Sequence, residues 1–128
     1  MTEAKVTRDA DTPVEAVIVY ATFPALVAAE VAAAAVVKLG LVACANILPG
    51  LTSLYIWEGR LQREQEVAVL MKTRGELAER VVAETRRLHP FENPAILVIP
   101  VVGGSADFLA WISTQTQEPA EAPAASRD

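Results

Sequence analysis

His89 and Glu92 are the residues of this sequence best suited to hold a metal ion. His89 is the only histidine of the chain, and Glu92 follows three positions later. A zinc or copper site needs three or four ligands, mostly His and Cys. This pair therefore predicts weak, exchangeable binding of Cu(II) or another divalent cation, with further ligands from other copies of the chain. The alternative is a structural histidine at a helix C-terminus, where the helix dipole favours a cation.

A second group of side chains could line a ligand-binding cleft between subunits: Tyr55, Trp57, Glu58, Glu66 and Lys72. Side chains alternate along a strand, so Tyr55 and Trp57 share a face. Lys72 comes just before a predicted helix N-terminus, where anions bind readily. The group therefore suggests a small polar or anionic ligand, although Glu66 could instead pair with Lys72 or a nearby arginine. We favour another interpretation, in which the two aromatic side chains anchor a subunit interface, their commoner use.

The sequence contains no recognisable catalytic constellation. One histidine without a plausible acidic and nucleophilic partner does not make a Ser-His-Asp triad. Gly103-Gly104 predicts a turn rather than a phosphate-binding loop. No pair of carboxylates is distinguished by an apolar setting that would separate their pKa values. We therefore expect a binding protein and not an enzyme.

The cleft residues lie in a segment, 55–73, that predicts an unusually long β-hairpin. Two apolar runs flank a polar turn at Glu58-Gly59, and each run is longer than the usual strand of about 5–6 residues. A chain of 128 residues cannot cover such a hairpin by itself. Its far end is expected to pair with another copy of the chain, and the residues expected at that interface are Tyr55, Trp57, Leu61, Val67 and Trp111.

Hydrophobic patterning predicts the elements around the hairpin. Residues 16–22 form a continuous apolar run that predicts a central strand buried on both faces. The other expected elements are an Ala-rich helix over 25–39 ended by Gly40, a strand over 42–57 bent at Pro49-Gly50, a return strand over 61–73, a helix over 74–88 capped by Thr73, a strand over 96–99 and a helix over 106–115.

The order β-α-β-β-α-β with a terminal helix predicts an α+β, ferredoxin-like sandwich. Residues 14–116 form this single domain, between a flexible N-terminus over 1–13 and a disordered Pro- and Ala-rich tail over 117–128. The helices of such a fold lie on one face of the sheet, so the other face needs cover. A cyclic trimer is the simplest closed assembly that supplies it.

Composition argues against two classes of partner, nucleic acids and membranes. The net charge of −5 argues against nucleic acid. No stretch resembles a signal peptide, and the longest apolar run, 24–37, is interrupted by Glu30 and too short to span a bilayer. Cys44 is the only cysteine, so no internal disulfide is required, and its alternating context suggests a buried strand residue. We expect a cytoplasmic protein that associates with neither nucleic acid nor membrane.

Several motifs, in order and spacing, resemble the CutA divalent-cation tolerance family over about residues 17–112. They are Ala43-Cys44-Ala45-Asn46-Ile47-Leu48-Pro49-Gly50, Ser53-x-Tyr55-x-Trp57-Glu58-Gly59, Glu66, Lys72-Thr73, Leu88-His89-Pro90-Phe91-Glu92-x-Pro94 and Asp107-Phe108-Leu109-x-Trp111-Ile112. The resemblance implies a trimeric ferredoxin-like fold, similar in design to the PII signalling proteins. It also implies a role in tolerance to divalent metals, with copper binding.

The chain departs from the family pattern at positions that bear on the metal. Ala21 stands nearest to where some members have a cysteine, and Leu88 stands in place of the first histidine of a His-His pair. Residues 25–27 replace acidic residues found in other members, and Phe91 replaces a tyrosine. The resemblance thus leaves His89 as the remaining ligand of the proposed copper site.

Overall fold

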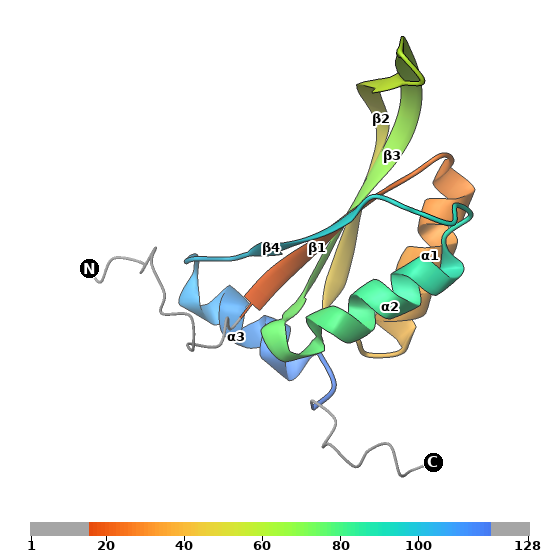
Figure 1. Cartoon of the computed structure of the whole chain (residues 1–128). Coiled ribbons are helices and arrows are strands. Elements are labelled where there is room, and N and C mark those ends of the chain that lie inside the picture. Colours follow the sequence, from red (N-terminus) through yellow and green to blue (C-terminus); the bar gives the residue numbers. More distant parts are fainter. Residues whose placement is uncertain (1–15, 119–128) are drawn as a thin grey trace.

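The framework of the protein is a four-stranded antiparallel sheet with strand order β2-β3-β1-β4. The computed structural model describes residues 16–118. Its elements are β1 (Ala16–Phe23), α1 (Leu26–Lys38), β2 (Cys44–Trp57), β3 (Arg60–Arg74), a 3-10 turn η1 (Gly75–Leu77), α2 (Ala78–Leu88), β4 (Ile96–Pro100) and α3 (Ala106–Thr114). The predicted ferredoxin-like α+β sandwich with a C-terminal helix is confirmed (Figure 1).

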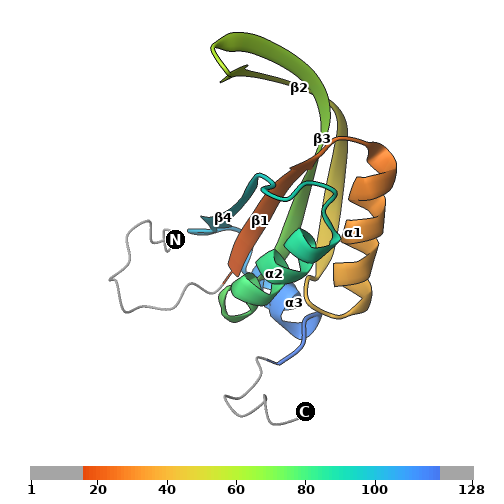
Figure 2. The ribbon, with the colours of Figure 1, turned by 45° about the vertical axis from the view of Figure 1, so that its right-hand side comes forward.

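Helices α1 and α2 cover one face of the sheet, whereas α3 lies at the end of the sheet opposite the hairpin tip (Figures 1 and 2). The core lies beneath α1 and α2 and includes Val19, Val36, Met71 and Val81, each fully buried. Small side chains such as Ala29 allow α1 to approach the strands closely. We call the surface under α1 and α2 the helix face, and the opposite surface the open face.

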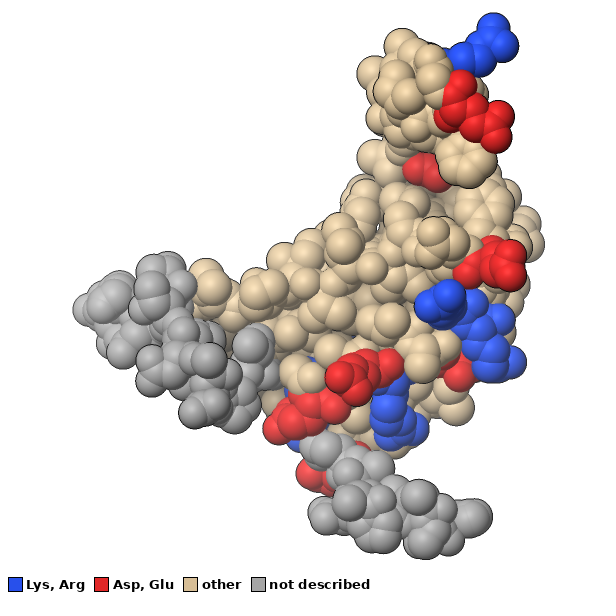
Figure 3. Space-filling model, viewed as in Figure 1, with Lys and Arg blue, Asp and Glu red and all other residues tan. Residues whose placement is uncertain are grey.

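Strand β1 is buried on one face only, which corrects the expectation of burial on both. Val17, Val19 and Ala21 are buried on the helix face, while Ile18 and Tyr20 on the open face are half-exposed. No element of residues 16–118 covers the middle of that face, and Figure 3 shows the side between hairpin and β4 almost free of charged groups. The apolar run therefore includes side chains on a face of the sheet that this chain leaves uncovered.

The hairpin of β2 and β3 projects well beyond the helices and curls at its far end (Figure 2). Its strands of 14 and 15 residues meet in a two-residue turn in which Glu58 has φ 51° and Gly59 φ 78°. Two successive positive φ values define the turn that matches the twist of paired strands, and glycine adopts this conformation without strain. The long hairpin predicted from the sequence is confirmed.

The predicted bend at Pro49-Gly50 is a β-bulge. Leu48 pairs with Ala68 and Leu51 with Glu66, so β2 contains one residue more than β3 over this interval. Side chains alternate along a strand, so one extra residue exchanges the faces of everything beyond it. Before the bulge, odd-numbered residues of β2 point to the helix face; after it, Tyr55 and Trp57 point to the open face.

One local expectation was wrong. Thr73 does not cap the following helix, because it is buried in β3 and its hydroxyl donates to the Leu41 carbonyl at 2.6 Å. Gln117, the first residue of the expected tail, contacts the end of α1: its backbone N–H donates to the Gly40 carbonyl at 2.8 Å, and its side chain donates to the Leu39 carbonyl. The flexible segment expected over 1–13, and the tail beyond Glu118, lie outside the described residues.

The expected end of α1 at Gly40 is confirmed, whereas the expected burial of Cys44 is not. Gly40 ends α1 in a left-handed conformation with φ 74°, and the amides of Gly40 and Leu41 donate to the last carbonyls of the helix. Cys44 is half-buried rather than buried, because it lies on the open face. No helix among residues 16–118 combines the length and apolar character needed to cross a membrane.

Replacing Thr73 by valine should test the buried hydroxyl. Thr73→Val keeps the shape of the side chain but leaves the Leu41 carbonyl without this donor, so the free energy of unfolding should fall by about 1–3 kcal/mol. Thr114→Val removes a similar hydroxyl bond at an exposed position and should change stability by less than about 0.5 kcal/mol. Guanidinium unfolding at fixed protein concentration measures both, and equal effects would contradict the structure.

Candidate functional site

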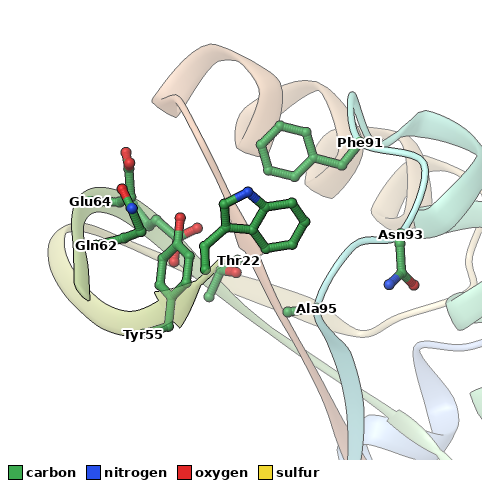
Figure 4. Close-up of a pocket in the computed structure, with 9 residues that line it drawn as sticks. Thr22, Tyr55, Gln62, Glu64, Phe91, Asn93 and Ala95 are labelled. Atoms are coloured by element: carbon green, nitrogen blue, oxygen red, sulfur yellow. The ribbon is translucent and has the colours of Figure 1, made fainter. Parts of the chain in front are cut away.

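A cavity of about 820 Å³ lies on the open face of the hairpin, where the hairpin meets the loop between α2 and β4. Its lining residues come from β1, β2, β3 and that loop, and they are Thr22, Tyr55, Trp57, Gln62, Glu64, Glu66, Phe91, Asn93 and Ala95. Tyr55 rises from the hairpin on one side and Phe91 reaches in from the loop on the other (Figure 4). Volume and mixed lining are those of a small-molecule site.

Strand register brings the hairpin residues of this cavity together. Tyr55 pairs with Gln62, Ser53 with Glu64 and Leu51 with Glu66. Paired residues point to the same face of a sheet, so these side chains and Trp57 lie together on the open face. The Ser53 hydroxyl donates to Glu66 Oε1 at 2.7 Å, which fixes one oxygen of that carboxylate.

Five cleft residues were predicted from the sequence, and the structure unites three of them. Tyr55, Trp57 and Glu66 line the cavity. Glu58 lies at the exposed tip of the hairpin turn and is not part of the lining. Lys72 lies six residues from Glu66 along β3, about 20 Å at 3.4 Å per residue, and its Nζ sits 5.4 Å from the ring centroid of Phe108 on α3. Within one subunit, Lys72 therefore belongs to a different surface.

The sequence analysis missed Gln62, Glu64 and the loop side chains of the cavity. The alternation of Gln62, Glu64 and Glu66 along the return strand was the signal that could have revealed a polar face. Phe91 carried no such signal, because only tertiary folding brings its loop to the hairpin. Figure 4 shows Gln62 and Glu64 on the same arm of the hairpin, close to Tyr55.

His89 is a buried link between the loop and the end of β1. It is 8% exposed, and its ring stacks on Phe23 with centroids 4.4 Å apart. Nδ1 accepts a hydrogen bond from the Phe91 amide at 3.0 Å, so Nε2 carries the proton and donates to the Thr22 carbonyl at 2.7 Å. Both ring nitrogens are engaged, and a metal ion could bind His89 only in place of one of these bonds.

The position of His89 matches the structural alternative left open by the sequence, because His89 follows the last residue of α2 directly. Its role there is to bind β1 rather than to cap a helix dipole. Glu92 lies three residues on, is exposed, and has its backbone carbonyl near Arg86 Nη2 at 3.4 Å. No group of three or more His, Cys, Asp or Glu side chains within residues 16–118 is arranged to hold a metal ion.

One of the predicted interface residues, Val67, has other surroundings than expected. It is 6% exposed and belongs to the core beneath the helices, so it is not available to a neighbouring copy of the chain. Trp111 is 39% exposed and stacks on Phe108 with ring centroids 5.6 Å apart, while Ile112 is the buried residue of α3. Leu61, by contrast, is 68% exposed near the hairpin tip.

The pKa values of Glu84 and Arg87 depart from their ordinary values, and both residues lie on the surface of α2, away from the cavity. The hydrogen bonds that Arg87 donates to Glu84 lower the pKa of Glu84, with a smaller contribution from the charge of Arg87. The same bonds raise the pKa of Arg87. Both groups keep their ordinary charges at neutral pH, and the pair is an i, i+3 contact on an exposed helix face.

Comparison with known proteins gives a consistent result. The model of the CutA1 divalent ion tolerance protein family matches residues 17–115. A divalent-cation tolerance protein CutA from Salmonella newport is 41% identical over 99 residues, which are 77% of this chain and 86% of the relative.

Solved structures agree. CutA1 from Oryza sativa superposes with a TM-score of 0.78 at 32% identity, over 83% of this chain and 97% of that one. A periplasmic divalent cation tolerance protein CutA from Archaeoglobus fulgidus gives a TM-score of 0.76 at 34% identity, over 80% and 99%.

His89→Ala should destabilise the protein through the contacts described above. The variant loses ring stacking and two hydrogen bonds at a buried position, so the free energy of unfolding should fall by about 2–4 kcal/mol. Glu92→Ala, at an exposed position in the same loop, should change it by less than about 0.5 kcal/mol. Chemical denaturation measures the free energy of unfolding of both variants. An unchanged value for His89→Ala would show that the contacts of His89 with β1 and the loop do not stabilise the fold.

Proposed function

This chain belongs to the CutA1 divalent ion tolerance protein family, and we propose on that premise that it acts in the cellular response to divalent metal ions. It does so as a cytoplasmic homotrimer that binds Cu(II) or a related divalent cation weakly, without catalysing a reaction. The family match across residues 17–115 carries this proposal.

The proposed metal ligands are His89 and Glu92, with further ligands from neighbouring subunits. Copper has the highest affinity of the divalent first-row metals for an imidazole and carboxylate site. The ion must displace the Phe91 amide from Nδ1 or the Thr22 carbonyl from Nε2. That competition costs binding free energy, and it supports weak, exchangeable binding rather than a permanent metal centre.

The trimer is proposed from the surface that one subunit leaves uncovered. Leu54, Ile56 and Leu61 on the side of the hairpin continuous with the helix face are 64%, 65% and 68% exposed, and Trp57 on the other side is 62% exposed. Both sides of the hairpin thus carry exposed apolar side chains, and a large exposed apolar surface indicates an interaction site. A cyclic trimer in which each hairpin packs on the next subunit buries it.

The cytoplasmic location is supported by cysteine usage. Cys44 is the only cysteine and forms no internal disulfide, so the fold does not depend on an oxidising compartment.

A PII-like trimer that binds a small metabolite between subunits is a second candidate function, and the cavity beside Tyr55 and Trp57 favours it. The anionic ligand expected from the sequence fits the cavity poorly, because Glu64 and Glu66 line it and Lys72 does not. A thermal-shift screen of metals, nucleotides and organic acids separates the two functions. A ligand that binds only the folded protein raises the unfolding midpoint, and the rise grows with the logarithm of its concentration over its Kd.

Cu(II) titration calorimetry should test the metal site. His89→Ala should lower the Cu(II) affinity at least tenfold, because the imidazole is the strongest donor of the proposed set. Glu92→Gln should lower it less, and Glu79→Gln, an exposed carboxylate on α2, should leave it unchanged. Circular dichroism must confirm that His89→Ala is folded at the temperature used, and equal affinities of wild type and folded His89→Ala would remove His89 from the site.

Ile56→Glu should test the trimer. Sedimentation equilibrium of the wild type should give three times 13.7 kDa, and Ile56→Glu should dissociate or unfold because a buried unpaired charge is costly. Val27→Glu on α1 replaces a residue that is 71% exposed and should leave the mass unchanged. A compact particle of 13.7 kDa from the wild type at micromolar concentration would contradict the proposal.

A further inference from the structure

We propose that residues 119–128 of this chain dock into the groove between α1 and β2 and cover its apolar floor. This goes beyond the proposed function and does not rest on it. The groove lies on the helix face and contains neither the proposed metal ligands nor the side chains beyond the bulge that the proposed trimer buries. Three observations carry the proposal: the apolar surface of α1, the position of Gln117, and the order of charges in the two segments.

Helix α1 exposes apolar side chains on the side that faces β2. Glu30 and Lys38 are the only charged residues of the helix. Together with β2, α1 forms a groove of about 370 Å³, whose apolar lining is Ala33, Ala34, Val37, Ala45 and Ile47. Val37 is 40% exposed there. A helix that is apolar on all sides is normally buried on all sides, so we expect another segment to cover the groove.

The chain reaches one end of this groove at Gln117. The Gln117 backbone N–H donates to the Gly40 carbonyl at 2.8 Å, and its side chain donates to the Leu39 carbonyl. Lys38, which lines the groove, is the residue directly before Leu39. Four residues of extended chain span about 13 Å. Residue 121 can therefore reach Lys38 while Gln117 keeps its hydrogen bonds.

The charges of the two segments are complementary in their order. Counted from the Gln117 end, Lys38 comes first in the groove, and Glu30 follows eight helical residues later, about 12 Å along the axis. In the docking segment Glu121 comes first and Arg127 follows six residues later, about 19 Å in an extended chain. The long lysine and arginine side chains span the difference. Neither groove residue belongs to an ion pair within residues 16–118.

The residues between Glu121 and Arg127 suit a shallow groove with a floor made largely of alanine. They are Ala122, Pro123, Ala124, Ala125 and Ser126. Proline disfavours a helix, so the segment would lie extended, with small side chains against the floor. Such a contact buries little area and is weak. A short tether supplies an effective concentration in the millimolar range, however, and a contact with a Kd of about 1 mM is then about half populated.

Paramagnetic NMR of the whole chain should test the docking. A nitroxide is attached at Ala124→Cys in a Cys44→Ala background, since Cys44 is the only natural cysteine, and the δ1 methyl groups of isoleucine are observed. Ile47 in the groove should lose most of its signal until the nitroxide is reduced. Ile112 is the control, because its carbonyl accepts a hydrogen bond from Thr116, next to Gln117. A segment moving freely about Gln117 would broaden Ile112 at least as much as Ile47.

Charge variants test the pairing of Glu121 with Lys38. Glu121→Lys should lower the docked population about two- to fivefold, because an exposed ion pair contributes about 0.2–1 kcal/mol. The double variant Lys38→Glu, Glu121→Lys should restore it, because the pair is formed again with exchanged signs. Glu79→Lys, the same change of charge on the exposed surface of α2, should leave it unchanged. Deletion of residues 119–128 should shift the Ile47 methyl resonance.

Three results would overturn the proposal. They are equal broadening of Ile47 and Ile112, undiminished broadening of Ile47 in Glu121→Lys, and no recovery in the double variant. An Ile47 resonance that depends on protein concentration but not on residues 119–128 would place a second copy in the groove, and it would also reject the proposal. Cu(II) titration and sedimentation test the metal site and the trimer separately, because the variants used here change neither the proposed metal ligands nor the hairpin tip.

Discussion

The hairpin of β2 and β3 extends beyond the helices that cover the rest of the sheet, and the other main features of the structure follow from it. Strands β2 and β3 of 14 and 15 residues leave the sheet and continue past α1 and α2 (Figure 1). Beyond the helices, apolar side chains emerge on both sides, with Ile56 on one and Trp57 on the other. Apolar surface of this extent costs free energy in water, so the hairpin favours association with other copies of the chain. The proposed trimer follows from this cost.

The two faces of the sheet differ in their burial. The helix face holds the core, in which residues such as Val19 and Met71 have no exposed surface. The open face is free of helices over its middle, and the bulge at Pro49-Gly50 turns Tyr55 and Trp57 toward it. One residue of extra chain thus decides that the aromatic side chains of the hairpin meet Glu64 and Glu66, and not the side of the hairpin that bears Ile56 and Leu61.

His89 connects the stability of the fold with the geometry of the cavity. Its ring joins the end of β1 to the loop after α2, and the same hydrogen bond that occupies Nδ1 holds the backbone of Phe91. His89, whose residue type suggests a metal ligand, therefore links two segments of the same chain. Any ligand that binds to the His89 ring must compete with its hydrogen bonds to Thr22 and Phe91. Any ligand in the cavity depends on the same hydrogen bonds, because they position Phe91.

Local patterns in the sequence were enough to predict the order of elements, the long hairpin, its turn at Glu58-Gly59, the bend at Pro49-Gly50 and the left-handed end of α1 at Gly40. Each of these is encoded by local periodicity or by the conformational freedom of glycine. The sequence also identified Tyr55, Trp57 and Glu66 as neighbours, since alternation and strand pairing act over short distances. Tertiary structure alone decided that Lys72 lies with Phe108, that Thr73 bonds Leu41, that Val67 is core, and that Phe91 closes the cavity. These contacts join segments distant in the sequence, and only the packing of helices and loops against the sheet fixes which distant groups meet.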